Sequence, residues 1–164
     1  MLSRLTLGDE SCYPRYVAEF DRLFQNGSPI LDAKGRTVTF DAKSCRHVCF
    51  KEDPAMADDP VRKWERTIWQ QERAECIPWI LETLANPSEI RVNHAAKDHH
   101  AYLLSLPSIH MPKPQLRFYV SVALTRDPLW VRFETAFIPE HHYWVAARKQ
   151  PHVEPVHKRK ERRW

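Results

Sequence analysis

The chain has 164 residues, of which 43% are hydrophobic and 28% are charged, as is typical of one globular domain. No stretch approaches 18 consecutive apolar residues, which excludes a membrane-spanning helix. The net charge of +4 resides in the last eight residues, HKRKERRW, which leaves 20 basic and 20 acidic residues upstream. A basic end of this kind attracts nucleic acid, but a solvated terminus has the same composition.

The N-terminal sequence predicts a cytoplasmic protein. Asp9 and Glu10 interrupt it before the apolar core of an export signal develops. The four cysteines are irregularly spaced, so in the cytoplasm we expect them to be reduced and to form no structural disulfides.

The first predicted element is an amphipathic helix over residues 14–24, where apolar residues recur at helical spacing. Two short segments follow, GRTVTF (35–40) and CRHVCF (45–50), which are either two short strands or a strand and a short turn-bounded segment. In a strand, Cys45, His47 and Cys49 would point to the same face. A structural zinc site needs four ligands, and no second cysteine pair accompanies these three residues. We therefore expect no metal, with the cysteines in the core and His47 either buried there or functional.

The longest helical pattern begins at Asp59, a suitable capping residue, and runs to Leu84. Pro78 lacks the backbone donor of a helix interior, so we expect a kink or a restart there. In such a helix Arg66 and Arg73, seven residues apart, share one face. They are suited to binding phosphate, or else extend along the surface and pair with neighbouring glutamates.

The second half of the chain changes to strand periodicity. Strands are predicted at residues 89–94, 100–106, 116–124, 130–137 and 143–149. Helices followed by such a series predict an α+β fold, with N-terminal helices packed on an antiparallel meander.

The strand 130–137 is expected to have two different faces. By alternation, one face carries Val131, Phe133, Thr135 and Phe137. The opposite face then carries Arg132 and Glu134, beside Ser121 and Tyr119 of the preceding strand. An arginine next to a glutamate suits acid–base chemistry on a phosphodiester, and it is equally typical of a solvated sheet face.

Taken in order, residues 36–148 resemble the phage-encoded branch of the barnase–EndoU–colicin–RelE (BECR) ribonuclease family. The resemblance depends on CRHVCF, on ERAECIPWILETLANPSEI and on VRFETAF. It implies a barnase-like fold, in a toxin or phage-related protein, that cleaves RNA without a metal or cofactor. A neutralising immunity protein or antitoxin is an implied partner. The chain departs from the family in its neutral body and in lacking a second histidine after RHVCF.

The resemblance also implies residue roles. It places the catalytic groups at His47, Arg73 and Thr135. In the expected mechanism the ribose 2′-hydroxyl attacks phosphorus and forms a 2′,3′-cyclic phosphate. The residues expected to bind substrate are Arg66, Arg132, Glu134, His142 and Lys149. Glu134, His141 and His142 are candidates for the second proton carrier.

Two other functions fit the same sequence. The fold could bind RNA without cutting it, using the basic tail and stacking bases on Tyr119, Tyr143 or Trp144. Alternatively, the chain is a structural or partner-bound protein of a phage or toxin system. The expected organisation is a helical extension at 1–30, a nuclease domain at 31–150 and a basic tail at 151–164.

Overall fold

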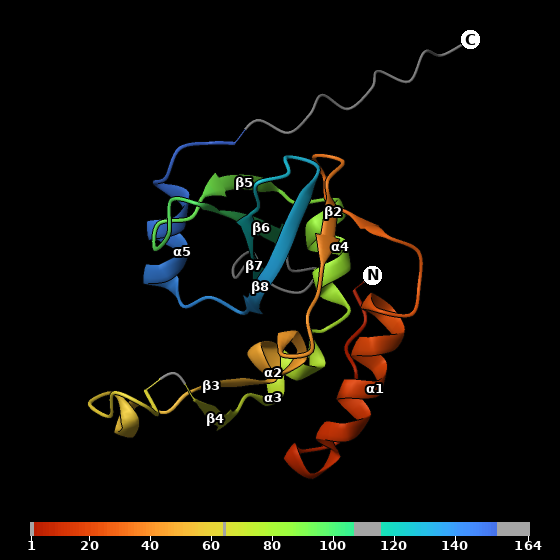
Figure 1. Ribbon diagram of the computed structural model, residues 1–164, viewed down its shortest axis with the longest axis vertical. Helices are drawn as coiled ribbons and strands as arrows, with labels where there is room; N and C mark the ends of the chain where they lie inside the picture. Colours follow the sequence, from red (N-terminus) through yellow and green to blue (C-terminus); the bar gives the residue numbers. More distant parts are fainter. Residues whose placement is uncertain (1, 64, 107–115, 154–164) are drawn as a thin grey trace.

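The computed structural model describes residues 2–63, 65–106 and 116–153 and shows an α+β fold, as predicted (Figure 1). Its main sheet has six strands in the order β1-β2-β8-β7-β6-β5. The strands are β1 (Ile30–Leu31), β2 (Thr37–Thr39), β5 (Glu89–Val92), β6 (His99–Leu106), β7 (Leu116–Leu124) and β8 (Trp130–Phe137). Strands β5 to β8 form the predicted antiparallel meander, but β2 pairs with β8 in parallel, so the sheet is mixed.

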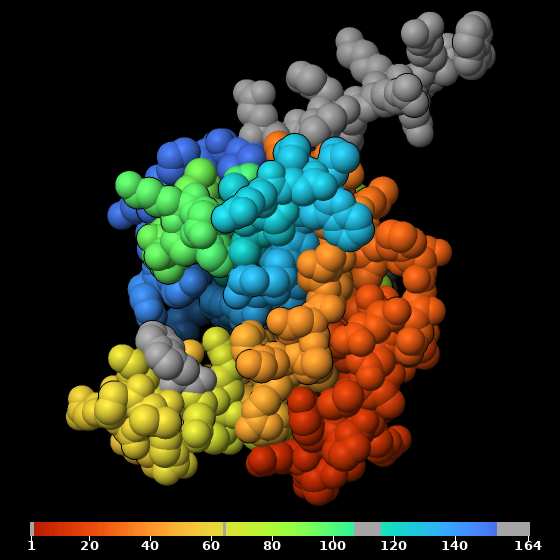
Figure 2. All heavy atoms as spheres, in the orientation of Figure 1, coloured from red at the N-terminus to blue at the C-terminus, as the bar shows by residue number. Residues whose placement is uncertain are grey.

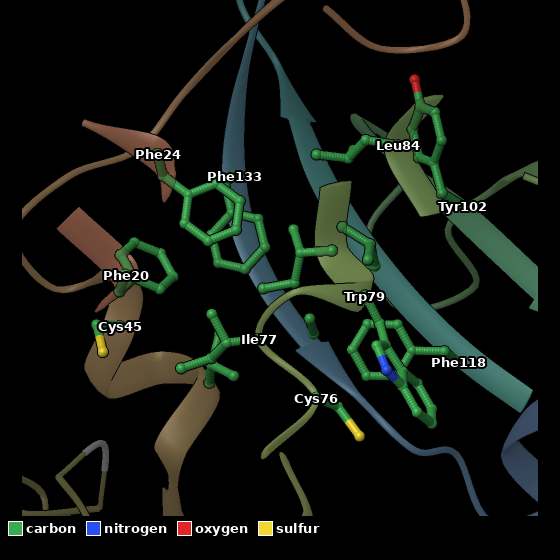
Figure 3. Close-up of a cluster of buried hydrophobic side chains, with 14 of the residues drawn as sticks. Phe20, Phe24, Cys45, Cys76, Ile77, Trp79, Leu84, Tyr102, Phe118 and Phe133 are labelled. Atoms are coloured by element: carbon green, nitrogen blue, oxygen red, sulfur yellow. The ribbon is translucent and has the colours of Figure 1, made fainter. Parts of the chain in front are cut away.

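The predicted N-terminal helix is α1 (Tyr13–Phe24), preceded by the short 3-10 helix η1 (Glu10–Cys12). Its buried residues Tyr16, Phe20 and Phe24 are four apart, and they join the main core between the sheet and α4 (Trp79–Ala85). Figure 3 shows Phe20 and Phe24 in the same part of the core as Phe133 of β8, and the ring centres of Phe20 and Phe133 are 6.5 Å apart. The segment predicted as an N-terminal extension thus shares the core of the rest of the chain. No helix in the described residues is long and apolar enough to cross a membrane.

Residues 45–50 form neither the strand nor the turn-bounded segment that the sequence predicted, because Ser44–Cys49 form the helix α2. Asp41 begins the turn before the helix, where its carboxylate accepts from the backbone N–H of Lys43. Buried Cys45, Val48 and Cys49 have helical i, i+3, i+4 spacing, which the alternation of polar and apolar residues conceals. The prediction that both cysteines belong to the core is confirmed.

The prediction of one long helix from Asp59 is also wrong. Strand β3 (Phe50–Glu52) pairs with β4 (Arg66–Trp69), and these flank the 3-10 helix η2 (Pro54–Met56). The described part of the segment between the two strands projects from the rest of the molecule at the lower left of Figure 2. The β-branched and aromatic residues of RTIW favour a strand. After β4 comes α3 (Gln71–Glu75), and α4 restarts immediately after Pro78, as expected of a residue with no N–H to donate. Arg66 and Arg73 therefore lie on different elements rather than on one helix face.

Residues 143–149, predicted as a strand, belong to the helix α5 (His141–Arg148). Trp144 and Ala147 are one helical turn apart, and both are buried against Ala101, Leu103 and Tyr119 of the sheet. Helix α5 covers the face of the sheet opposite to α1 and α4 (Figure 1). The basic tail lies beyond the described residues from position 154 onward.

Candidate active site

A β-bulge in β8 determines which side chains reach the α5 side of the sheet. Ser121 of β7 pairs with Thr135, whereas the next residue, Val122, pairs with Phe133. Glu134 is therefore the extra residue of the bulge, and alternation changes phase there. The prediction that Thr135 shares a face with Phe133 is wrong. Thr135 lies on the same face as Ser121, while Phe133 is buried in the main core.

His47 of α2 is in direct contact with this bulge. Its Nδ1 lies 3.3 Å from the backbone carbonyl oxygen of Glu134. The Thr135 hydroxyl donates to the backbone carbonyl of His47 at 3.4 Å. The structure thus brings His47 and Thr135 together, although they are 88 residues apart in the sequence.

Arg66 of β4 attaches the two-stranded ribbon to the same helix end. Its Nη1 lies 3.3 Å from the carbonyl oxygens of both His47 and Phe50. Its Nη2 lies 3.5 Å from a carboxylate oxygen of Glu52. A cavity of about 300 Å³ opens here, lined by Lys43, Arg46, His47, Glu65, Arg66 and Thr67. Four of these six side chains carry or can carry positive charge, so the cavity suits an anion.

Arg73 of α3 reaches the same side of β8, with its guanidinium 5.0 Å from the ring centre of Phe137. Burial lowers the pKa of Arg73, and the charge of Arg66 lowers it further. Glu72 and Glu140 line the adjoining cavity of about 360 Å³. Neither forms an ion pair with Arg73, and it has no carboxylate partner elsewhere in residues 2–63, 65–106 and 116–153. A half-buried cation in this position is available to an external anion.

Glu134 itself connects three elements. Its Oε1 accepts from Arg132 Nε at 2.9 Å and Nη2 at 2.6 Å, so the two predicted substrate-binding residues form an ion pair. The same oxygen lies 4.0 Å from Nε2 of His99 in β6. The Nδ1 of His99 lies 2.8 Å from Asp98. Sequence reasoning missed His99, because its side chain reaches Glu134 of β8 across β7, and only the strand pairing shows this. The one signal in the sequence was the pair Asp98 and His99 at the start of β6.

The remaining predicted residues lie apart from His47. His141 Nδ1 is 3.1 Å from Arg117, which is four residues from Ser121 along β7, or about 13 Å. His142 lies 3.4 Å from Glu140. Together with His94 and Lys149, these histidines line a separate cavity of about 550 Å³.

The aromatic residues proposed to stack bases are mostly unavailable. Tyr119 is fully buried, Trp144 is 3% exposed, and Tyr143 packs edge-on against the Tyr119 ring. The binding-module hypothesis therefore loses its aromatic support on this face.

The cysteine pair beside His47 belongs to the core rather than to the cavity. The Cys45 and Cys49 sulfurs are 3.9 Å apart, and the hydrogen bond between them and burial raise the pKa of Cys49. Among the described residues, no group of three His, Cys, Asp or Glu side chains is arranged to hold a metal ion.

Comparisons with protein-family models, with curated proteins and with solved structures found no match.

Proposed function

We propose that this chain is a metal-independent endoribonuclease that cleaves RNA by attack of the 2′-hydroxyl on the adjacent phosphorus. The observation that carries the proposal is Arg73, a half-buried guanidinium with no carboxylate partner in the described residues. It lies within electrostatic range of Arg66, and Arg66 contacts the backbone of His47. Two adjacent cations beside a histidine suit a phosphodiester whose charge grows in the transition state.

His47 is suited to act as the base. If Nδ1 carries the proton, it donates to the Glu134 carbonyl oxygen, and Nε2 keeps a lone pair. Nε2 would then remove the proton of the 2′-hydroxyl as the 2′-oxygen attacks phosphorus. The Thr135 hydroxyl, next to the His47 backbone, would orient a non-bridging phosphate oxygen.

The test is cleavage of end-labelled single-stranded RNA in excess chelator by the wild-type chain and by His47→Ala. We expect products ending in a 2′,3′-cyclic phosphate, no cleavage of the all-deoxy strand, and a loss of at least about 100-fold in His47→Ala. His152→Ala is the matched control, because His152 is exposed and its one contact among the described residues is a backbone bridge to Arg91.

Cleavage by His47→Ala at the rate of the control would contradict the proposal, as would cleavage that stops in chelator. Binding of RNA without cleavage by the wild-type chain would instead support a binding module.

A further inference from the structure

We infer that His99 is the second proton carrier of this site, the acid that protonates the leaving 5′-oxygen. The inference deepens the proposed function and rests on it. The observation behind it is that His47 and His99 approach the same bulge residue, Glu134, from different elements. His47 meets its backbone carbonyl, and His99 meets its carboxylate.

Strand pairing places His99 on the correct face. His99 pairs with Ala123, and Ala123 pairs with Arg132. Directly paired residues direct their side chains to the same face, so His99 lies in one row with Arg132. Thr135 also lies on this face, because the bulge at Glu134 shifts the alternation of side chains along β8. Two strand spacings separate the backbones of His99 and Arg132, about 10 Å, and the Glu134 side chain lies within this gap.

The surroundings of the two histidines differ in a way that assigns their roles. Each ring nitrogen of His99 faces an anionic hydrogen-bond acceptor, the carboxylate of Asp98 at 2.8 Å from Nδ1 and that of Glu134 at 4.0 Å from Nε2. Arg132 offsets part of the Glu134 charge. His47 instead meets a neutral carbonyl through Nδ1, so Nε2 is the nitrogen that would take the substrate proton. The histidine between two acceptors is therefore assigned as the acid, and His47 as the base.

The other candidates for the acid are less suitable. The Glu134 carboxylate oxygen already accepts two hydrogen bonds from Arg132. His141 contacts Arg117 at the far end of β7, and His142 contacts Glu140. His99 is, within the described part of the chain, the other histidine that contacts the bulge residue, and its side chain keeps 21% of its surface exposed.

The step is balanced with these two histidines alone. His47 takes the proton of the 2′-hydroxyl, and the bond from the 2′-oxygen to phosphorus forms. The bond from phosphorus to the 5′-oxygen breaks, and the 5′-oxygen receives its proton from His99. The products are a 2′,3′-cyclic phosphate and a free 5′-hydroxyl, and a net proton passes from His99 to His47.

The experiment measures the rates at which the wild-type chain and His99→Gln cleave two substrates. One is a ribodinucleotide, whose 5′-alkoxide leaving group needs a proton. The other is uridine 3′-(4-nitrophenyl phosphate), whose phenolate leaves without one. We expect ribodinucleotide cleavage to fall about 100- to 10,000-fold, and cleavage of the nitrophenyl ester to change less than about threefold. The alkaline limb of the pH–rate profile should disappear, because an acid must be protonated to act. His152→Gln is the control.

The outcomes separate the two proposals. If His99→Gln cleaves both substrates at the wild-type rate, or if its cleavage rate falls by the same factor on both, His99 is not the acid. The ribonuclease proposal still stands in either case. If the wild-type chain cuts neither substrate, both proposals fail. Should His99→Gln melt at a lower temperature than the control, Asp98→Asn gives the same decision, because Asp98 orients the His99 ring through Nδ1. A loss in Asp98→Asn that is confined to the ribodinucleotide supports the inference, and equal rates or equal losses on both substrates overturn it.

Discussion

His100 should make the folded protein less stable as the pH falls below 7. Its ring belongs to a buried network in which Arg36 Nε lies 2.8 Å from Asp32 and the Tyr102 hydroxyl donates to the same carboxylate at 2.6 Å. Arg36 Nη2 lies 3.3 Å from Nδ1 of His100. A guanidinium only donates, so Nδ1 must accept, and a proton there would break the contact.

The sign follows from the direction of the pKa change. Burial, and then the charges of Arg36 and Lys34, lower the pKa of His100 from 6.5 to about 4, while Asp32 opposes this change. The unfolded chain therefore binds the proton first as the pH falls. The stability conferred by neutral His100 is fully present above about pH 6.5 and is lost as the pH falls toward 4.

The magnitude follows from the same two values. A pKa difference of about 2.5 at 1.36 kcal/mol per unit gives an upper limit of about 3.4 kcal/mol. The ring is partly exposed, and screening by solvent reduces this by about half. Between pH 7 and pH 5 the linkage relation then gives a loss of about 1 kcal/mol from this residue.

The assay is urea unfolding of the wild type and of His100→Asn at pH 7 and at pH 5. Asparagine can accept from Arg36 but does not titrate. Other titrations are common to both chains and cancel in the difference. The wild type should lose about 1 kcal/mol more than His100→Asn over this interval, and His152→Asn should behave as wild type. Equal losses in the wild type and in His100→Asn would refute the reasoning.

Three further predictions concern the site and the tail. Arg73→Lys should keep the fold but cleave RNA about 10- to 1,000-fold more slowly, because a point charge replaces a planar fork; Arg22→Lys, on the exposed side of α1, should match wild type in melting temperature and rate. Thr135→Val should lose about 100-fold in cleavage and about 1 kcal/mol or less in unfolding free energy, and unchanged cleavage would remove the hydroxyl from the site. Deleting residues 157–164 removes five basic residues and one acidic residue, so RNA affinity should fall at low salt with a shallower salt dependence; an unchanged slope in a binding titration would show that the tail does not contact RNA.

The sequence correctly predicts the elements whose hydrophobic spacing matches the face that they bury in the structure. The spacing of Tyr16, Phe20 and Phe24 admits only a helix, and β7 alternates over nine residues. The failures are short segments. Four residues of β4 lie within a helical pattern, and only pairing with β3 stabilises the extended form. Helix α5 has eight residues, too few for the period to distinguish helix from strand.

The sequence named His47 and Thr135, which the structure brings together, but it did not show the geometry that joins them. Thr135 stood out as a polar residue in an apolar alternation, and the bulge at Glu134 explains why. No pattern within β8 shows where that bulge falls, because it is a property of the pairing with β7. His99 was missed for the same reason: its relation to Glu134 passes through β7, between β6 and β8.

The parallel pairing of β2 with β8 imposes an order on folding during synthesis. Thr37 meets Trp130, 93 positions later, so the β1–β2 pair cannot join the rest of the main sheet until β8 is made. At about 5–20 residues per second, that wait lasts about 5–20 s. Packing of Phe20 in α1 is also completed only after β8 is made, because its ring centre lies 6.5 Å from that of Phe133 in β8. A nascent chain stalled before Trp130 therefore presents an unpaired strand edge and an apolar helix side, the features by which chaperones and proteases select unfinished proteins.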